Sequence, residues 1–421
     1  MNTSRLVALC LYAYIFFNSW TDAFKIGAWR PIYMVPLLGA LLLAFFHSIL
    51  SKNIQSLRIS FSWPDIGILL LFLHLLLSST FNTTPKTLNY LLAYVFVIFV
   101  QYFLLKQMLI KYTNFKTLLN VNSVAILVVS VFCCTDLFLE SVFSFDLQVT
   151  IPRTRAATAT VANGLFRRSY GFSTEPTIVA YYLNALAPIA LWNIRERKFY
   201  LFSGLKPLCF LVVFVALLST FSTAGFVVLF VTCLITVIFV WRPKRSSFTT
   251  KKIIKYLIIF MFVCFLVYLS SDFWLRVFED NWGKLTLNKD YKSVRGRLGY
   301  FQFYFNEVLV DPFWGYGLGK VSSSGMSSPM NWYLMLAYEL GVFPLVGVGI
   351  FLGGHLMRVL KMKTRLRIPF FMGILASCGH LGSVATFYNP FLWSLLAIFS
   401  FYLRETQKVG CGQKSGGNVC L

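Results

Sequence analysis

Long apolar segments recur along the whole of this 421-residue chain and restrict what it can fold into. A run of about 20 apolar residues lets a helix cross the hydrocarbon core of a bilayer. Only helices and closed barrels satisfy their backbone polar groups there. Charged residues make up 13% of the chain, against about 25% in an ordinary soluble domain. The sequence therefore predicts an all-α, polytopic transmembrane bundle that forms one domain over residues 1–404.

We count about 12 spans, and eleven or thirteen are also compatible with the pattern because the first and last runs are short. Residues 1–20 have features of a signal peptide, but Ser19-Trp20-Thr21 is a poor cleavage site, which favours an uncleaved helix. The polar segment 405–421 is expected to be a disordered cytoplasmic tail. The predicted limits are 5–20, 31–50, 64–80, 88–106, 118–140, 176–193, 205–220, 224–241, 253–271, 338–357, 366–386 and 388–403.

The basic residues predict how these spans are oriented. With both termini in the cytoplasm, most of the 38 Lys and Arg residues fall in short cytoplasmic loops, and the short outer loops are nearly neutral. This is the distribution that the positive-inside rule requires. Two long outer loops, at about 141–175 and 272–337, are basic exceptions. Loops of this length are usually functional or disordered, and their many aromatic residues favour order.

The net charge of +23 comes in short bursts between apolar runs and not in one basic domain. It therefore indicates topology signals and contact with anionic membrane lipid, and not nucleic-acid binding. The nine cysteines follow no metal-binding spacing, and the two long outer loops contain none of them. We expect no bound metal and no structural disulfide.

The first long loop carries four arginines and only two acids, Asp146 and Glu175. Guanidinium groups present a planar fork that matches phosphate oxygens. Together with the second loop, they could clamp a diphosphate on the outer face. The alternative, contact with lipid headgroups or local acids, is stronger for the second loop, where acids nearly balance the basic residues. The arginines of the first loop are Arg153, Arg155, Arg167 and Arg168.

Glu175 stands directly before an apolar helix. Pro176 suits the first turn of a helix, and Thr174 is a candidate N-cap. A carboxylate at this place can accept a proton from a sugar hydroxyl. Its alternative role is to complement the helix dipole or to pair with Arg168.

The second loop contains a predicted amphipathic helix and a glycine-rich turn. Leu298, Phe301, Phe305, Val308 and Leu309 follow helical spacing, and Asp311-Pro312 ends the pattern. We expect this helix to lie on the membrane surface and to bury that stripe. In the turn 315–319, glycines alternate with aromatic or aliphatic residues, which is compatible either with a glycan site or with a loop that only needs a tight backbone.

Several kinds of site have no sequence signal. The outer loops carry no Asp-x-Asp pair of the kind that holds a nucleotide-sugar metal, and the chain has no Walker A motif. The four histidines lie in or near spans. His380 has two readings, a functional group inside the bundle and a packed core residue, and the second is favoured.

The order of three motifs resembles the superfamily of O-antigen polymerases and O-antigen ligases, which are bacterial membrane glycosyltransferases. Arg155 also precedes Gly171 at a spacing similar to that in polymerase outer loops. The motifs are Arg168-Ser-Tyr-Gly-Phe-Ser-Thr-Glu-Pro176, Gly296-Arg297 with the stretch up to Gly315-Tyr-Gly-Leu-Gly319, and Asn331-Trp-Tyr-Leu with Glu339-Leu-Gly341.

The resemblance implies an enzyme of the bacterial inner membrane that acts on a polyprenyl-diphosphate-linked oligosaccharide and needs no cofactor. It also admits a chain-length regulator protein as a partner. The implied catalytic residues are Arg168, Arg297 and Glu175. The implied substrate-binding residues are Arg153, Arg155, Arg167, Arg295, Gly171, Gly317 and Asn331.

Two departures from the family pattern bear on the reaction. Ligases carry a His before the Asn that matches Asn331, and this chain has Met330, which favours a polymerase. A Ser-Arg pattern near the seventh span is replaced by Ser222-Thr-Ala-Gly225, which leaves a substrate contact there in doubt. A ligase or an oligosaccharyltransferase is the first alternative. A lipid-linked oligosaccharide flippase and a structural membrane protein are alternatives of other classes.

Overall fold

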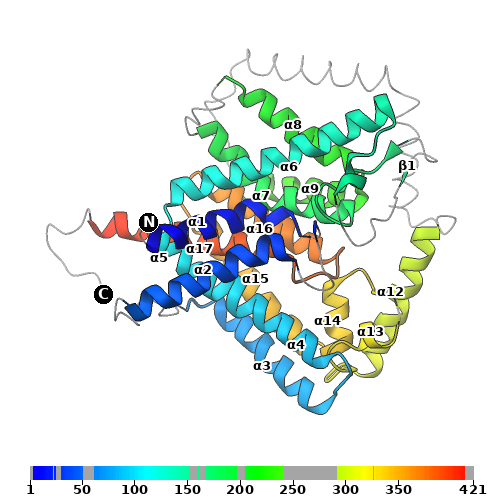
Figure 1. The fold of residues 1–421 in the computed structure, drawn as a ribbon. Helices are drawn as coiled ribbons and strands as arrows, with labels where there is room; N and C mark the ends of the chain where they lie inside the picture. Colours follow the sequence, from blue (N-terminus) through cyan, green and yellow to red (C-terminus); the bar gives the residue numbers. More distant parts are fainter. Residues whose placement is uncertain are drawn as a thin grey trace.

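A computed structural model describes residues 3–21, 23–24, 30–50, 61–151, 160–161, 166–196, 204–240, 292–325 and 327–412 (Figure 1). Arg153, Arg155, the predicted span 253–271, the first part of the second long loop and residues 413–421 lie outside this range. Over the described residues the prediction of an all-α fold is confirmed, apart from two strands of two residues each. β1 (Thr160–Val161) pairs antiparallel with β2 (Phe166–Arg167).

Within the described residues, five helices are long and apolar enough to cross a membrane. Three shorter apolar helices accompany them, so the count of 12 spans stays a prediction. The five are α2 (Pro31–Leu50), the continuous segment formed by α4 (Thr87–Val95), the π-helix η3 (Phe96–Leu104) and α5 (Leu105–Tyr112), then α6 (Phe115–Phe143), α7 (Pro176–Glu196) and α15 (Phe343–Leu360). The shorter ones are α3 (Asp65–Phe81), α8 (Lys206–Ser219) and α9 (Thr223–Phe239).

The remaining helices complete the described part of the bundle and its loops. They are α1 (Thr3–Phe16), the short helices η1 (Phe17–Ser19) and η4 (Leu147–Thr150), α12 (Lys292–Val310), α13 (Lys320–Ser323), α14 (Trp332–Leu340), α16 (Arg367–Leu381) and α17 (Pro390–Gly412). The expected disordered tail therefore needs correction over residues 405–412, which continue α17.

The predicted span 338–357 is also wrong at its start. The chain ends α14 at Leu340, turns at Gly341 with a φ of +81°, and begins α15 at Phe343. A Cβ on residue 341 would lie 2.1 Å from the carbonyl oxygen of Phe313, so only glycine fits this turn. The sequence remains hydrophobic across this turn, whereas the helix is interrupted there.

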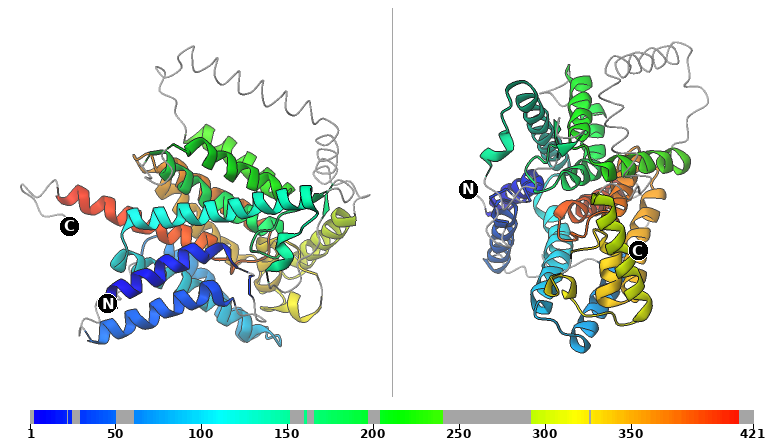
Figure 2. Two further views of the ribbon diagram at one scale, coloured as in Figure 1. Left: turned by 45° about the horizontal axis from the view of Figure 1, so that its top comes forward. Right: turned by 90° about the vertical axis from the view of Figure 1, so that its right-hand side faces the viewer.

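Helices pack side by side along the bundle in pairs that are distant in sequence. The main pairs are α3 with α15, α7 with α16, and α6 with α8. In Figures 1 and 2, α1 begins and α17 ends at one end of the bundle, and β1 and α12 lie at the other. The described parts of the two long loops therefore share one end.

A buried ionic network ties α3 to the helices beside it, and nothing in the hydropathy pattern predicts it. Lys106 Nζ lies 3.1 Å from Asp65 Oδ2, and the two side chains are 3% and 1% exposed. The Tyr102 hydroxyl donates to the other oxygen of Asp65, and it lies 3.1 Å from Nε2 of His355 on α15. Several hydrogen bonds to one buried carboxylate offset the cost of removing it from water.

Candidate functional site

The segment Arg168–Glu175 folds into the bundle and does not extend away from it. The backbone N–H of Ser169 donates to the carbonyl of Ser219 at 2.9 Å, which joins the segment to the end of α8. Gly171 turns the chain with a φ of +51°, and a Cβ there would meet Cys133 Sγ at 3.3 Å. Since Cys133 lies ten residues before the end of α6, the turn is recessed by about 15 Å from that end.

Phe172 anchors this segment by packing between aromatic rings of two other elements. Its ring stacks on Trp20 at 4.0 Å and lies 4.5 Å from the ring of Phe132. The side chain is 6% exposed. Gly171 and Phe172 therefore fix the position of the loop, and this assigns Gly171 a role in packing.

Arg168 lies beside the break between α8 and α9. Its Nε donates to the carbonyl of Thr220 at 3.0 Å, and its side chain is half-buried. Phe221 in the break has a φ of +41°, and the Ser222 hydroxyl caps α9 by accepting from the N–H of Gly225 at 3.1 Å. The predicted boundary between the apolar segments 205–220 and 224–241 is confirmed, and Ser222 serves there as a helix cap.

Two helices begin next to each other at this place. The hydroxyls of Ser222, before α9, and Thr177, in the first turn of α7, lie 3.4 Å apart. The helices approach so closely that a Cβ on Gly225 would lie 2.6 Å from the Cβ of Ala180. Helix N-termini attract anions through their unsatisfied N–H groups and their dipole. Arg168 adds a positive charge beside these two helix starts, and the carboxylate of Glu175 adds a negative charge directly before α7.

Glu175 directly precedes α7, and its side chain is exposed. Its carbonyl accepts a hydrogen bond from the N–H of Ile178 at 3.1 Å. Glu175, and not the predicted Thr174, therefore occupies the position immediately before the helix. The carboxylate is accessible, and it also suits the dipole at the helix start.

The glycine-rich turn of the second loop packs against the chain between α3 and α4. Gly317 donates its N–H to the carbonyl of Glu339 at 2.9 Å. Asn82 donates through Nδ2 to the carbonyl of Gly315 at 2.8 Å, and the Thr84 hydroxyl donates to the carbonyl of Leu318 at 2.7 Å. At Gly317, with a φ of +95°, a Cβ would lie 2.4 Å from the carbonyl oxygen of Asn82. These contacts assign the glycines to close backbone packing.

The predicted amphipathic helix is present as α12, and its end before Asp311 is confirmed. The contact of its apolar stripe with the membrane surface stays a prediction. Tyr304 is fully buried, its hydroxyl donates to the carbonyl of Ser327 at 2.9 Å, and its ring packs on Tyr338 of α14. Val308 of the predicted stripe is also buried, whereas Phe301, Phe305 and Leu309 lie outside the face that α14 covers and are exposed on the surface of the protein.

Arg297 is exposed on α12, and Arg295 belongs to the same helix. Asn331 is the N-cap of α14, and its Oδ1 accepts from the N–H of Leu334 at 3.0 Å. Arg167 lies in β2, opposite Thr160. Of the predicted residues, Arg168 and Glu175 stand near the starts of α7 and α9, while Arg297, Gly317 and Asn331 belong to the α12–α14 region at the same end of the bundle (Figure 1).

Glu339 was not among the predicted site residues. It is 3% exposed, and its Oε1 accepts from the N–H of Val321 at 3.1 Å, which holds α13 against α14. Burial disfavours the charged form and raises the pKa of this carboxyl to about 7. The only sequence signal was its place in Glu339-Leu-Gly341, at the start of a segment read as a span.

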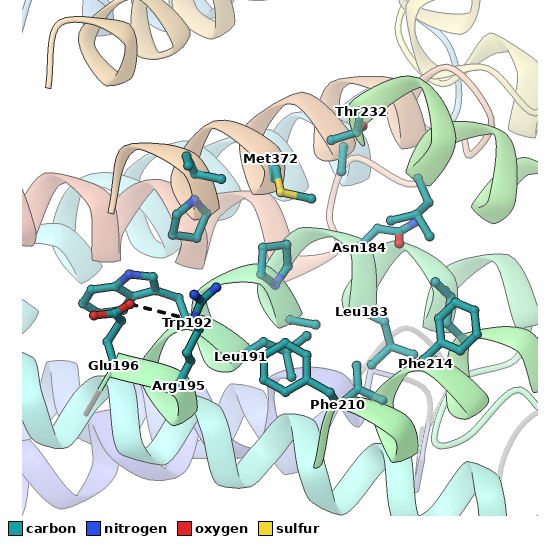
Figure 3. A pocket seen from close by; sticks show the side chains of 18 of the residues that line it. Leu183, Asn184, Leu191, Trp192, Arg195, Glu196, Phe210, Phe214, Thr232 and Met372 are labelled. Carbon is teal, nitrogen blue, oxygen red and sulfur yellow. Dashed lines mark ion pairs between the residues drawn. The ribbon is translucent and has the colours of Figure 1, made fainter. Parts of the chain in front are cut away.

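An apolar cavity of about 720 Å³ lies along α7, α8, α9 and α16 (Figure 3). Its lining runs from Asn184 to Arg195 and Glu196, which form an ion pair at 3.9 Å. Glu196 also pairs with Arg365 at 3.0 Å. Arg195 lies near the end of α7 that is distant from Glu175, about 30 Å along the helix. The cavity therefore extends from Leu217 and Asn184, near the start of α9, to the charged residues at the far end of α7.

Comparison with known families is informative for the second half of the chain. A family model described as O-antigen ligase matches residues 208–349, from α8 into α15. The match contains Arg297, Gly317 and Asn331 and does not reach Arg168 or Glu175. No curated protein matches the chain. Residues 208–349 are therefore similar to the O-antigen ligase family, and this similarity agrees with the resemblance seen in the sequence motifs.

Proposed function

We propose that this protein is a membrane glycosyltransferase that polymerises polyprenyl-diphosphate-linked oligosaccharide repeat units into O-antigen or a related surface polysaccharide. The superfamily supports a membrane enzyme with glycosyltransferase-like activity on lipid-linked oligosaccharide. The observation that carries the proposal is the position of Arg168 beside the starts of α7 and α9. Such a place favours an anion such as diphosphate. The reaction face is periplasmic in this proposal, and both termini are cytoplasmic.

In the proposed reaction, a hydroxyl of the acceptor repeat unit attacks the anomeric carbon of the growing chain. The bond from this carbon to the diphosphate oxygen breaks, and the diphosphate lipid leaves with the bonding electron pair. Arg168 and Arg297 stabilise the negative charge that develops on the leaving group. Glu175 accepts the proton of the hydroxyl. Its exposed carboxylate is accessible to a substrate.

The other predicted residues have supporting roles. Arg153, Arg155, Arg167 and Arg295 add positive charge that draws an anionic substrate to this face. Gly171, Gly317 and Asn331 shape the two loops through their backbone turns and the helix cap. Membrane lipid surrounds the spans, and a separate regulator of chain length is compatible with the proposal.

A ligase is the second candidate, because the matching family model is described as O-antigen ligase. Met330, at the position where ligases carry a His, favours the polymerase. Deletion of the gene separates the two functions. Loss of a polymerase leaves single repeat units on the lipid core, and loss of a ligase leaves none. The second result would overturn the proposed polymerase.

The arginine roles are tested by expressing variants in the deletion strain. Arg168→Ala and Arg297→Ala are expected to abolish the long polysaccharide while the protein remains at its normal level in the membrane. Arg365→Ala is the control, because this exposed arginine pairs with Glu196 at the other end of α7. Full-length polysaccharide from both stably expressed variants would contradict the arginine roles.

A further inference from the structure

A second cavity, of about 680 Å³, lies between the first turn of α2 and the continuous segment α4–η3. This volume is in the range of small-molecule sites, roughly 300–1,000 Å³. Apolar side chains form much of its wall, among them Met34 on α2, Ala93 on α4 and Val97 on η3. The cavity is distinct from the arginine region around Arg168.

A buried arginine stands at one end of this cavity. Arg30 is 7% exposed, and its Nη1 donates to Oδ1 of Asn389 at 3.3 Å. The guanidinium lies 4.6 Å from the ring centre of Tyr388, a cation–π contact. Asn389 and Tyr388 thus hold a permanent positive charge at the cavity wall, immediately before the apolar helix α2.

A buried amide stands further along the cavity. Gln101 is 1% exposed, and its Oε1 has no hydrogen-bond partner among the described residues. It lies in η3, a π-helical segment, and such segments are frequent at functional sites. An unsatisfied buried carbonyl costs about 1–3 kcal/mol. This polar group is an independent sign that the cavity is adapted to a ligand.

The length of the cavity matches a lipid in one leaflet. Asn89 and Gln101 both line it and are twelve residues apart on one helical segment, a distance on the order of 15 Å. This is about half of the 30 Å hydrocarbon core. A guanidinium at one end and an apolar wall below it complement a phosphate headgroup with a long apolar tail.

The cavity wall is continuous with the α12–α14 region. Phe387, which lines the cavity, stacks on Tyr94 at 3.8 Å, and the Tyr94 hydroxyl accepts from Nε1 of Trp332 at 3.3 Å. Trp332 follows the helix cap Asn331. Tyr90, also on the wall, shares a hydrogen bond with Ser322 beyond the glycine-rich turn. A headgroup at Arg30 is therefore next to the second loop.

We propose that this cavity binds the polyprenyl-diphosphate lipid of the acceptor repeat unit, with the diphosphate at Arg30 and the first part of the chain along α4 and η3. The inference rests on the proposed polymerase function, because polymerisation joins two substrates that each carry a diphosphate lipid. One set of arginines serves the departing lipid of the donor. The acceptor lipid stays attached to its sugar and needs a place of its own.

The test uses the full-length protein in lipid nanodiscs and a polyprenyl diphosphate with a photoreactive group near the headgroup. Cross-linked residues are located by mass spectrometry, without any turnover. We expect cross-links at the start of α2 and on α4, at least tenfold weaker binding in Arg30→Ala, and loss of these cross-links in Ala93→Trp, which fills the cavity. Leu88→Trp is the matched control, because Leu88 is an exposed residue of the same helix and does not line the cavity.

Competition with wild-type protein provides a readout that needs no variant. Unlabelled polyprenyl diphosphate should remove the cross-links, and an equal excess of phosphatidylglycerol should leave them. Equal competition by phosphatidylglycerol would assign the cavity to bulk phospholipid and overturn the proposal, as would unchanged cross-links in both Arg30→Ala and Ala93→Trp. Absence of polymer from the wild-type protein would count against the polymerase function alone, since binding is measured separately.

Discussion

Replacing Gly317 by Ala tests whether the glycine-rich turn serves packing or substrate contact. A Cβ added to Gly317 would lie 2.4 Å from the carbonyl oxygen of Asn82, and the φ of Gly317 is +95°. Strain of this kind costs about 1–3 kcal/mol. The clash also separates the turn from the α3–α4 connection, where the bonds from Asn82 and Thr84 each contribute about 1 kcal/mol. We expect a total loss of about 3–5 kcal/mol.

The measurement is hydrogen exchange of the purified protein, read over residues 82–87 and 315–323. Gly317→Ala should speed exchange in both segments, because the two segments hold each other. Gly349→Ala is the control: this glycine is exposed in α15, and a Cβ there meets no described atom within 4 Å. Unchanged exchange in Gly317→Ala, together with loss of polymer, would refute the packing role and favour direct substrate contact.

Three further predictions concern stability. Asn331→Ala should cost about 1 kcal/mol in thermal unfolding because α14 loses its cap, and Asn331→Ser should recover most of it. Asp65→Asn and Lys106→Met alone should each cost about 3–5 kcal/mol by leaving a buried partner uncompensated, and the double variant should be more stable than either, by the same assay. Burial raises the pKa of Glu339 to about 7, so the protonated carboxyl stabilises the folded state. This contribution to the free energy of unfolding is complete below about pH 4.5 and is lost as pH rises through 7, by up to about 3 kcal/mol. Glu339→Gln should remove this pH dependence from unfolding curves.

The sequence predicted the elements that depend on local pattern. The apolar runs located α2 at its observed limits, Pro176 marked the start of α7, and Asp311-Pro312 marked the end of α12. Composition also excluded a soluble domain. The hydropathy of a segment is a sum over its residues, so it can be read without knowing any tertiary contact.

Contacts between distant segments were not predictable from the pattern. Tyr304 of α12 packs on Tyr338, and this contact depends on the position of α14, which the local pattern of α12 does not specify. The need for glycine at position 341 comes from the close approach of the Phe313 carbonyl, which lies 28 residues earlier in the sequence. A local pattern does not show this contact.

In the candidate site, too, local motifs were predictable and contacts between distant segments were not. Arg168 was singled out by its motif, but its contact with Thr220 and the adjoining starts of α7 and α9 come from tertiary packing. Arg30 belongs to a short connection before α2, and no motif in the sequence singled it out. Its place at a cavity wall depends on Asn389 and Tyr388, which are more than 350 residues away in the sequence.

The rate of polymer formation by purified protein, with a synthetic polyprenyl-diphosphate-linked repeat unit as the only substrate, tests the central claim most directly. The account predicts a ladder of products from the wild-type protein. It also predicts rates lower by about 10²–10³ in Arg168→Ala and Arg297→Ala, and a normal rate in Arg365→Ala. A ladder formed equally fast by the Arg168 and Arg297 variants would contradict the claim, as would a wild-type protein that binds the substrate and never joins two repeat units.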